Sequence, residues 1–96
     1  MVINYINTDF TLVSGSYYSL PFRIEARDTL MTIECALTGN GSVVIQQSID
    51  DVTWFDVTNT SFTCSPMGQQ SYVECQPELL FRLKSSTEFI TAKILI

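Results

Sequence analysis

Hydrophobic and polar residues alternate along much of the chain with a period of two, most clearly in residues 30–37, 79–84 and 89–96. Because successive side chains of a β-strand point to opposite faces, such alternation predicts strands with one buried face. No helical period persists for ten residues. The inward-facing positions predicted in these segments are Met31, Ile33, Cys35, Leu37, Leu79, Phe81, Leu83, Ile90, Ala92, Ile94 and Ile96.

The first third of the chain continues this pattern less regularly. A short strand at 10–12, a turn at Ser14-Gly15-Ser16 and a second strand that begins near Tyr17-Tyr18 are expected there. Residues 20–27 then alternate again, and Pro21 places this strand at a sheet edge or at a strand start because proline has no N–H to donate. Its predicted inward-facing residues are Leu20, Phe22, Ile24 and Ala26.

Residues 41–57, GSVVIQQSIDDVTWFDV, predict a β-hairpin. The first strand presents Val43, Ile45 and Ile49 on one face, and Asp50-Asp51 supplies a turn before extended structure resumes. An aliphatic strand is thus followed by an aromatic one.

The connection that leads into this hairpin contains Asn40-Gly41. Asn-Gly pairs tolerate the positive φ angles that a type I′ turn requires. We therefore expect strands 30–37 and 42–49 to be antiparallel neighbours.

Turn residues recur every eight to twelve positions, which divides the chain into about eight short strands. This spacing predicts an all-β fold, an antiparallel β-sandwich of the jelly-roll or Ig-like type. With 96 residues and no linker or repeat, residues 1–96 are expected to form a single domain.

The charge distribution disfavours two classes of partner. Ten acidic residues against five basic ones give a net charge of −5, and the basic residues are scattered, so a nucleic-acid surface is not expected. The N-terminus shows no secretion signal and the longest apolar runs are too short for a membrane span, so we expect a protein made in the cytoplasm. Only 16% of residues are charged, which is typical of a surface that a partner covers in part.

The chain has an odd number of cysteines, which argues against a full disulfide framework: Cys35, Cys64 and Cys75. We interpret them as reduced, mostly buried thiols, with a Cys64–Cys75 bridge as the alternative. There is no CxxC motif and no histidine, so no conventional zinc site and no cofactor are expected.

The residues that carry catalysis are also sparse. Serine, threonine and cysteine are present, but no histidine is available to activate them, so the chain is not expected to be an enzyme and no catalytic residue is assigned. Asp50, Asp51 and Asp56 lie near the hairpin tip and could serve as acid and base or bind Ca²⁺. We interpret Asp50 and Asp51 as turn residues, because aspartate in turns usually accepts backbone hydrogen bonds.

Four aromatic residues are candidates for contact with a ligand or a partner. Trp54 together with Tyr17, Tyr18 and Tyr72 could form a platform for sugar rings, which makes a carbohydrate-binding module the alternative function. The other interpretation places them in the core or at a subunit interface.

A short basic stripe is the remaining surface feature. Arg82 and Lys84 alternate on the outer face of one predicted strand, and Lys93 lies on the next. We interpret this stripe as a solvated face or, failing that, as a contact with another subunit.

Two segments together resemble a known class of protein. Residues 44–54, VIQQSIDDVTW, and residues 80–84, LFRLK, followed by a turn and a final aliphatic strand, are similar to segments in small β-sandwich proteins of bacteriophage virions. The resemblance covers residues 42–96, and Asp51 stands where that pattern has glycine. It implies a head decoration, auxiliary capsid, head-fibre or tail accessory protein that is located in the virion, forms a homotrimer and binds major capsid or tail proteins.

Overall fold

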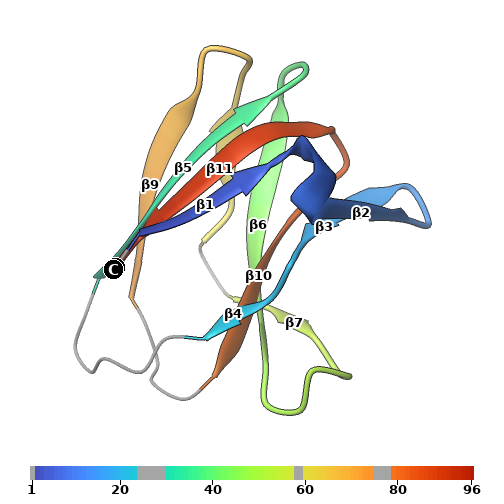
Figure 1. The fold of residues 1–96 in the computed structure, drawn as a ribbon, viewed down its shortest axis with the longest axis vertical. Helices are drawn as coiled ribbons and strands as arrows, with labels where there is room; N and C mark the ends of the chain where they lie inside the picture. Colours follow the sequence, from blue (N-terminus) through green and yellow to red (C-terminus); the bar gives the residue numbers. More distant parts are fainter. Residues whose placement is uncertain (1, 24–29, 58–59, 75–78) are drawn as a thin grey trace.

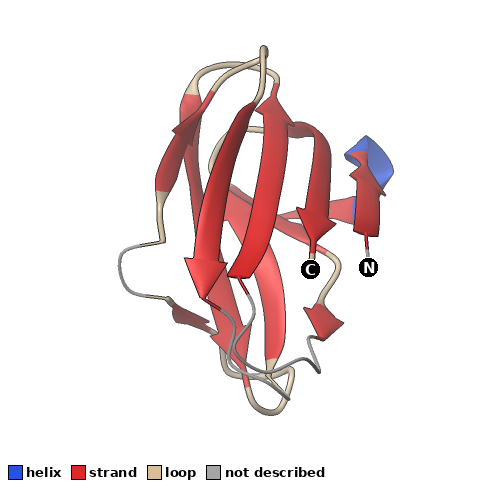
Figure 2. Cartoon of the chain, turned by 90° about the vertical axis from the view of Figure 1, so that its left-hand side faces the viewer, coloured by secondary structure: helices blue, strands red, loops and turns tan. Residues whose placement is uncertain are grey.

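The computed structural model describes residues 2–23, 30–57, 60–74 and 79–96, with the side chains of 70–74 left aside. These residues form eleven β-strands and one short 3₁₀ helix, arranged as two facing antiparallel sheets (Figures 1 and 2). The predicted all-β antiparallel sandwich is therefore confirmed. The chain has no helix in its described part that is long and apolar enough to cross a membrane.

One sheet has four strands and the other has seven. The four-stranded sheet has the order β1-β11-β5-β9, from β1 (Val2–Ile6), β11 (Phe89–Leu95), β5 (Leu30–Leu37) and β9 (Gln69–Glu74). The seven-stranded sheet has the order β2-β3-β10-β6-β7, with β4 paired to β10 and β8 paired to β6. Its strands are β2 (Phe10–Val13), β3 (Ser16–Ser19), β4 (Phe22–Arg23), β6 (Gly41–Ser48), β7 (Phe55–Asp56), β8 (Phe62–Cys64) and β10 (Leu80–Ser85), and the 3₁₀ helix η1 (Asn7–Asp9) joins β1 to β2.

Several short strands act as parts of longer ones. β3 and β4 both pair with β10, and the register between them slips by one residue at Leu20-Pro21, where proline interrupts the ladder. β7 and β8 both lie on the far side of β6 from β10. We count β3–β4 and β7–β8 each as one strand position and leave β2 aside as an added strand at the edge. The sheet orders are then 1-8-3-6 and 2-7-4-5, which is the connectivity of a jelly roll.

The core lies between the two sheets and is filled mainly by the positions that alternation predicts. Six predicted inward residues on β5 and β10 are at most 1% exposed, namely Met31, Ile33, Cys35, Leu37, Phe81 and Leu83. Phe22, Val43, Ile45, Ala92 and Ile94 are also buried, and aromatic contacts extend the core toward β2, where Phe10 stacks on Phe89 at 4.2 Å between ring centroids. The faces of these strands were thus predictable from the sequence.

The expectation that strands 30–37 and 42–49 pair with each other is wrong. β5 pairs with β11 and β9, whereas β6 pairs with β10, β7 and β8 in the opposite sheet. Neither Gly39 nor Gly41 has the positive φ of a type I′ turn. Gly41 is required for a different reason, since a Cβ built there would lie 2.9 Å from Cβ of Thr87 and 3.2 Å from Cδ1 of Leu37.

Two other predicted core positions are also corrected. Ile90 is 42% exposed because a bulge between Phe89 and Thr91 shifts the register against β5, so that Phe89 takes the buried position. Leu20 is 51% exposed because it lies at the break between β3 and β4. Ile24 and Ala26, predicted to continue this strand, lie outside the described residues.

At the N-terminus the expected hairpin is present, with Ser14 at φ 50° and Gly15 at φ 85° between β2 and β3. Two positive φ angles in a two-residue loop match a type I′ turn, which suits the twist of the paired strands. Strand β1, which precedes this hairpin, is a strand that the sequence pattern did not reveal.

Cys35 and Cys64 are buried free thiols, as expected. The Cys64 thiol donates a hydrogen bond to the carbonyl oxygen of Cys35 at 2.9 Å, and burial raises the pKa of Cys35 well above its ordinary value. The alternative bridge from Cys64 to Cys75 is not formed, and Cys75 itself lies outside the described residues.

Candidate functional site beside the β6–β7 loop

The loop from Ile49 to Trp54, here called the β6–β7 loop, is held by two side chains. The Ser48 hydroxyl accepts hydrogen bonds from the backbone N–H of Asp50 at 3.3 Å and of Asp51 at 2.9 Å. Oδ1 of Asp50 accepts from the N–H groups of Val52 and Thr53, both at 3.0 Å, and from the Ser48 hydroxyl at 3.1 Å. These hydrogen bonds, that from Thr53 first, lower the pKa of Asp50.

The backbone of this loop takes its sharpest bend at Asp51, whose φ is 63°. Aspartate tolerates this left-handed conformation better than most residues, although glycine adopts it more easily. The structure thus places Asp50 and Asp51 in the turn, with Asp50 as the acceptor that closes it. Asp56 lies apart from them on β7 and accepts a hydrogen bond from Gln46.

Three residues on the outer face of the seven-stranded sheet form a group that is here called the arginine cluster: Tyr18, Arg82 and Trp54. The guanidinium carbon of Arg82 lies 4.2 Å from the ring centroid of Tyr18 and 4.2 Å from that of Trp54, so two aromatic rings flank the cation. Lys84 adds a second cation 6.0 Å from the Tyr18 ring. The cluster connects three strand regions, β3, β10 and the end of the β6–β7 loop.

Hydrogen bonds fix the orientation of the guanidinium group. Nε of Arg82 donates to Oε1 of Gln46 at 2.8 Å, and Nε2 of Gln46 donates to Oδ1 of Asp56 at 2.9 Å. Gln46 is only 6% exposed although it lies on the outer face, because these neighbours cover it. Partial burial lowers the pKa of Arg82. Within the described residues, Nε is the atom of this guanidinium group that forms a hydrogen bond.

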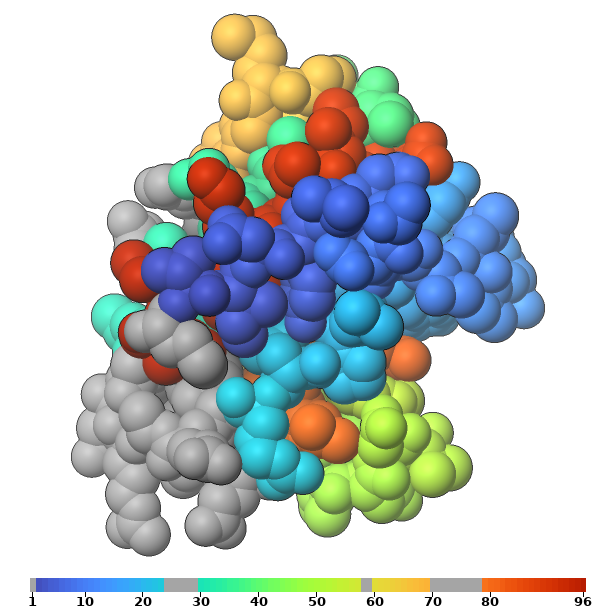
Figure 3. Space-filling view, viewed as in Figure 1, coloured from blue at the N-terminus to red at the C-terminus, as the bar shows by residue number. Residues whose placement is uncertain are grey.

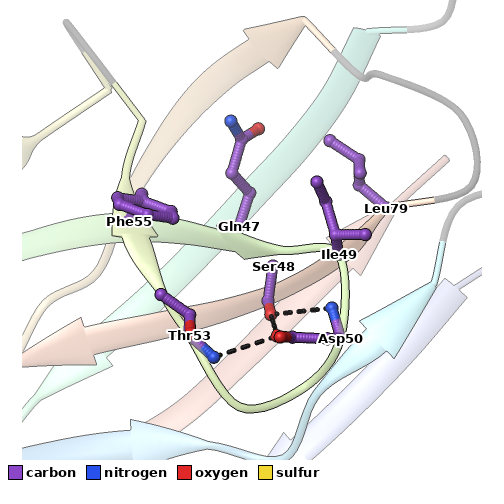
Figure 4. Close-up of a pocket in the computed structure, with 7 residues that line it drawn as sticks. All are labelled: Gln47, Ser48, Ile49, Asp50, Thr53, Phe55 and Leu79. Carbon is purple, nitrogen blue, oxygen red and sulfur yellow. Dashed lines mark hydrogen bonds between the residues drawn. The ribbon is translucent and has the colours of Figure 1, made fainter.

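On the other side of the same loop lies an apolar pocket of about 350 Å³, here called the loop pocket (Figure 4). Ile49 and Phe55 at its wall are 85% and 64% exposed, and Val52 on the loop is 80% exposed. The strand register places three neighbouring residues on the inner face of the sheet, namely Phe81, Gln47 and Phe55. The pocket therefore continues the core face toward the loop. The pocket is lined by Gln47, Ser48, Ile49, Asp50, Thr53, Phe55 and Leu79.

Ile49, expected on the same face as Val43 and Ile45, therefore lies outside the core. The ladder between β6 and β10 ends at the pair Ser48–Leu80, and Ile49 follows it into the loop.

The four aromatic residues predicted as a contact platform do not lie together. Trp54 and Tyr18 flank Arg82, whereas Tyr17 packs against the core. Adjacent residues of a strand point to opposite faces, so Tyr17 and Tyr18 cannot share one surface. Tyr72 lies on β9 of the other sheet, opposite Thr32.

The predicted basic stripe is also divided. Arg82 and Lys84 share the outer face of β10, but Lys93 lies on β11, which follows β10 in the chain and belongs to the opposite sheet. The sequence predicts Arg82 as a solvated residue, whereas the structure places it between two aromatic rings and hydrogen-bonds it to Gln46. Gln46 itself is not among the residues that the sequence predicts for a site. The only sequence signal for Gln46 is a polar side chain within an aliphatic strand.

No group of three or more histidine, cysteine, aspartate or glutamate residues in the described ranges is placed to hold a metal ion. The carboxylates of Asp50 and Asp56 instead accept hydrogen bonds from their own loop and from Gln46. What the site offers is therefore a fixed cation between aromatic rings and an apolar pocket beside it.

Comparison with protein-family models, with curated proteins and with solved structures finds no match to this chain.

Proposed function

We propose that this protein is a non-enzymatic structural component of a bacteriophage particle, which self-associates and attaches to a larger capsid or tail surface. The jelly roll is an architecture used by viral capsid proteins, and it is also used by lectin domains. The resemblance of residues 42–96 to small virion proteins supports the first of these two uses.

The observation that carries this proposal is the amount of apolar surface on a small domain. Twelve large hydrophobic side chains in the described residues are at least 42% exposed, against fourteen buried hydrophobic residues in the core. Single exposed apolar residues are ordinary, but contiguous ones mark contact surfaces. Ile49 and Phe55 form such a group at the loop pocket, and Val52, 80% exposed, lies on the same loop.

Solution mass is the first test. Light scattering or sedimentation is expected to give a mass of at least two chains of 10.8 kDa, and a monomer at all concentrations would contradict self-association. The number of copies also tests the trimer that the resemblance implies.

Attachment is tested at the loop pocket. The proteins encoded by the genes on either side of this one, co-expressed with it, are expected to include a capsid or tail protein that co-purifies with the wild type. The double variant Ile49→Ser/Phe55→Ser is expected to lose this partner, while Thr53→Ser, which keeps the same loop, retains it. Equal recovery with both variants would remove the loop pocket as the attachment surface.

A second candidate function, carbohydrate binding, is favoured by the arginine cluster. Two aromatic rings flank a guanidinium group whose η nitrogens can donate to a carboxylate, which suits an acidic sugar. Trp54 is the single tryptophan of the chain, so its fluorescence reports on this site directly. Glucuronate is expected to change that fluorescence in the wild type but not in Arg82→Met, with glucose as the neutral control; no response to either sugar would dismiss this candidate.

A further inference from the structure

Strand β1 has a free edge. Among the described strands it lies at the end of the four-stranded sheet and pairs with β11 alone. The N–H of Ile6 donates to Oδ2 of Asp9 at 2.9 Å and is therefore directed away from β11. Because backbone groups alternate in direction along a strand, the N–H and C=O groups of Val2 and Asn4 also point to this free edge.

Sheet edges in monomeric proteins are usually protected, and β1 carries none of the usual protective features. Its sequence VINYI contains no proline, lysine or other charged residue, and its register with β11 is continuous from Val2 to Ile6 without a bulge. In the seven-stranded sheet, by contrast, the ladder of β3 and β4 with β10 is interrupted at Pro21, and β4 and β7 are each only two residues long. The backbone groups of Val2 and Asn4 on this edge are thus open to pairing, whereas the N–H of Ile6 already donates to Asp9, and strand β1 lies at the surface in Figure 3, coloured dark blue.

The sequence of β1 is compatible with pairing to itself. An antiparallel arrangement centred on Asn4 places Val2 opposite Ile6 of a second copy, and Ile3 opposite Tyr5 of that copy. This register keeps every residue on its own face of the sheet, which a shift by one residue would not do. Val2 and Ile6 are 56% and 60% exposed on the outer face, and no charged residues of β1 are brought together.

The surroundings of β1 favour an added strand as well. Leu95, the partner of Val2 on β11, is 52% exposed and continues the apolar row on the outer face. Across the sandwich, the seven-stranded sheet carries β2 one position beyond β3. Leu12 of β2 shares the face of Tyr17, which packs against the core, and yet Leu12 is 56% exposed. Extending the four-stranded sheet past β1 would bring a strand toward Leu12.

We propose that β1 pairs antiparallel with β1 of a second copy of this chain, so that two four-stranded sheets join across a two-fold axis at Asn4. This inference rests on the proposed self-association and names the surface that produces it. Because a two-fold contact closes on itself, the resulting unit contains two copies.

A cysteine at the two-fold axis tests the register. Residues directly opposite in an antiparallel pair lie about 5.5 Å apart at Cα, which a disulfide can span. In a Cys75→Ser background, Asn4→Cys is expected to form a cross-linked dimer under mild oxidation. Lys93→Cys is the matched control, since Lys93 lies beside Asn4 on β11 and its two copies would be about 14 Å apart, three strand spacings. Cross-linking of both variants to the same extent, or of neither, would overturn the register.

A second variant tests the free edge without a cross-link. Asn4→Pro removes the N–H at the centre of the contact, and we expect the dimer dissociation constant to rise at least tenfold in sedimentation experiments, with circular dichroism confirming the fold. A trimer, or a multimer of unchanged mass in Asn4→Pro, contradicts the β1 contact but leaves the proposed function standing. A wild type that is monomeric throughout contradicts both.

Discussion

Strand β5 and the β6–β7 loop carry the same kind of residue with opposite outcomes. Ile33 on β5 is fully buried, whereas Ile49 at the start of the loop is 85% exposed, although both occupy the inward side of an alternating pattern. β5 lies between β11 and β9 and faces the second sheet, while Ile49 follows the last pair of β6 with β10. Alternation thus predicts the direction of a side chain, whereas its place within or beyond the paired part of its strand distinguishes the buried residue from the exposed one.

The strongest test of this comparison is to truncate both isoleucines. Ile33→Ala is expected to lower the free energy of unfolding by about 2–5 kcal/mol, because it removes buried methyl groups and leaves a cavity. Ile49→Ala is expected to change it by less than about 0.5 kcal/mol, as at other exposed sites. Denaturant unfolding measures both. A large loss for Ile49→Ala would show that the loop is covered in solution.

The same physical distinction explains how much of the fold was predictable. The faces of β5, β10 and most of β11 follow from alternation, and the β2–β3 hairpin follows from Ser14-Gly15. Alternation does not predict to which sheet a strand belongs, because inward-facing hydrophobic residues give the same pattern in either sheet. Strands β5 and β6 were therefore assigned to one hairpin, although a jelly roll places them in opposite sheets.

Gly41, where the chain enters β6, gives the next largest expected effect. A methyl group there would meet Thr87 and Leu37, so Gly41→Ala is expected to destabilise the protein by about 1–3 kcal/mol through overpacking. Thr87→Ala in the same chain removes the Thr87 hydroxyl and should recover part of this loss in a double-mutant cycle. If Gly41→Ala alone were neutral, the close approach at this crossing between sheets would be wrong.

The arginine cluster could not be assembled from the sequence. Tyr18, Trp54 and Arg82 come from separate parts of the chain, and only the pairing of β3 and β6 with β10 brings them together. Tyr18 and Trp54 were recognised as candidates because aromatic residues stand out in a sequence. From the sequence, Arg82 is predicted only as part of a solvated basic stripe, because an arginine that alternates with hydrophobic residues along a strand ordinarily faces solvent.

Removing the Arg82 guanidinium group is expected to have a moderate effect on the stability of the region around the β6–β7 loop. Arg82→Met is expected to cost about 1 kcal/mol, because the guanidinium group is only partly buried and cation–π contacts at such sites contribute about 0.5–1 kcal/mol. It should also shift the fluorescence of Trp54 toward that of a more mobile, hydrated indole. Lys84→Met, on the same face but 6.0 Å from Tyr18, is the control. Equal effects of both variants would indicate a general charge effect.

The smallest expected effect concerns the pH dependence of the β6–β7 loop. The backbone N–H groups of Thr53 and Val52 lower the pKa of Asp50 in the folded protein, so the ionised carboxylate stabilises the fold above its unfolded pKa of about 3.9. This contribution is lost as the pH falls through the lower folded value. The stability advantage of the wild type over Asp50→Asn should therefore be present at pH 6 and should vanish in strong acid. Asp51→Asn keeps the Asp50 acceptor and serves as the control for loss of one charge. If the stability difference between the wild type and Asp50→Asn did not change with pH, the carboxylate charge would not hold the loop. The conformation of the β6–β7 loop would then depend on Ser48 alone.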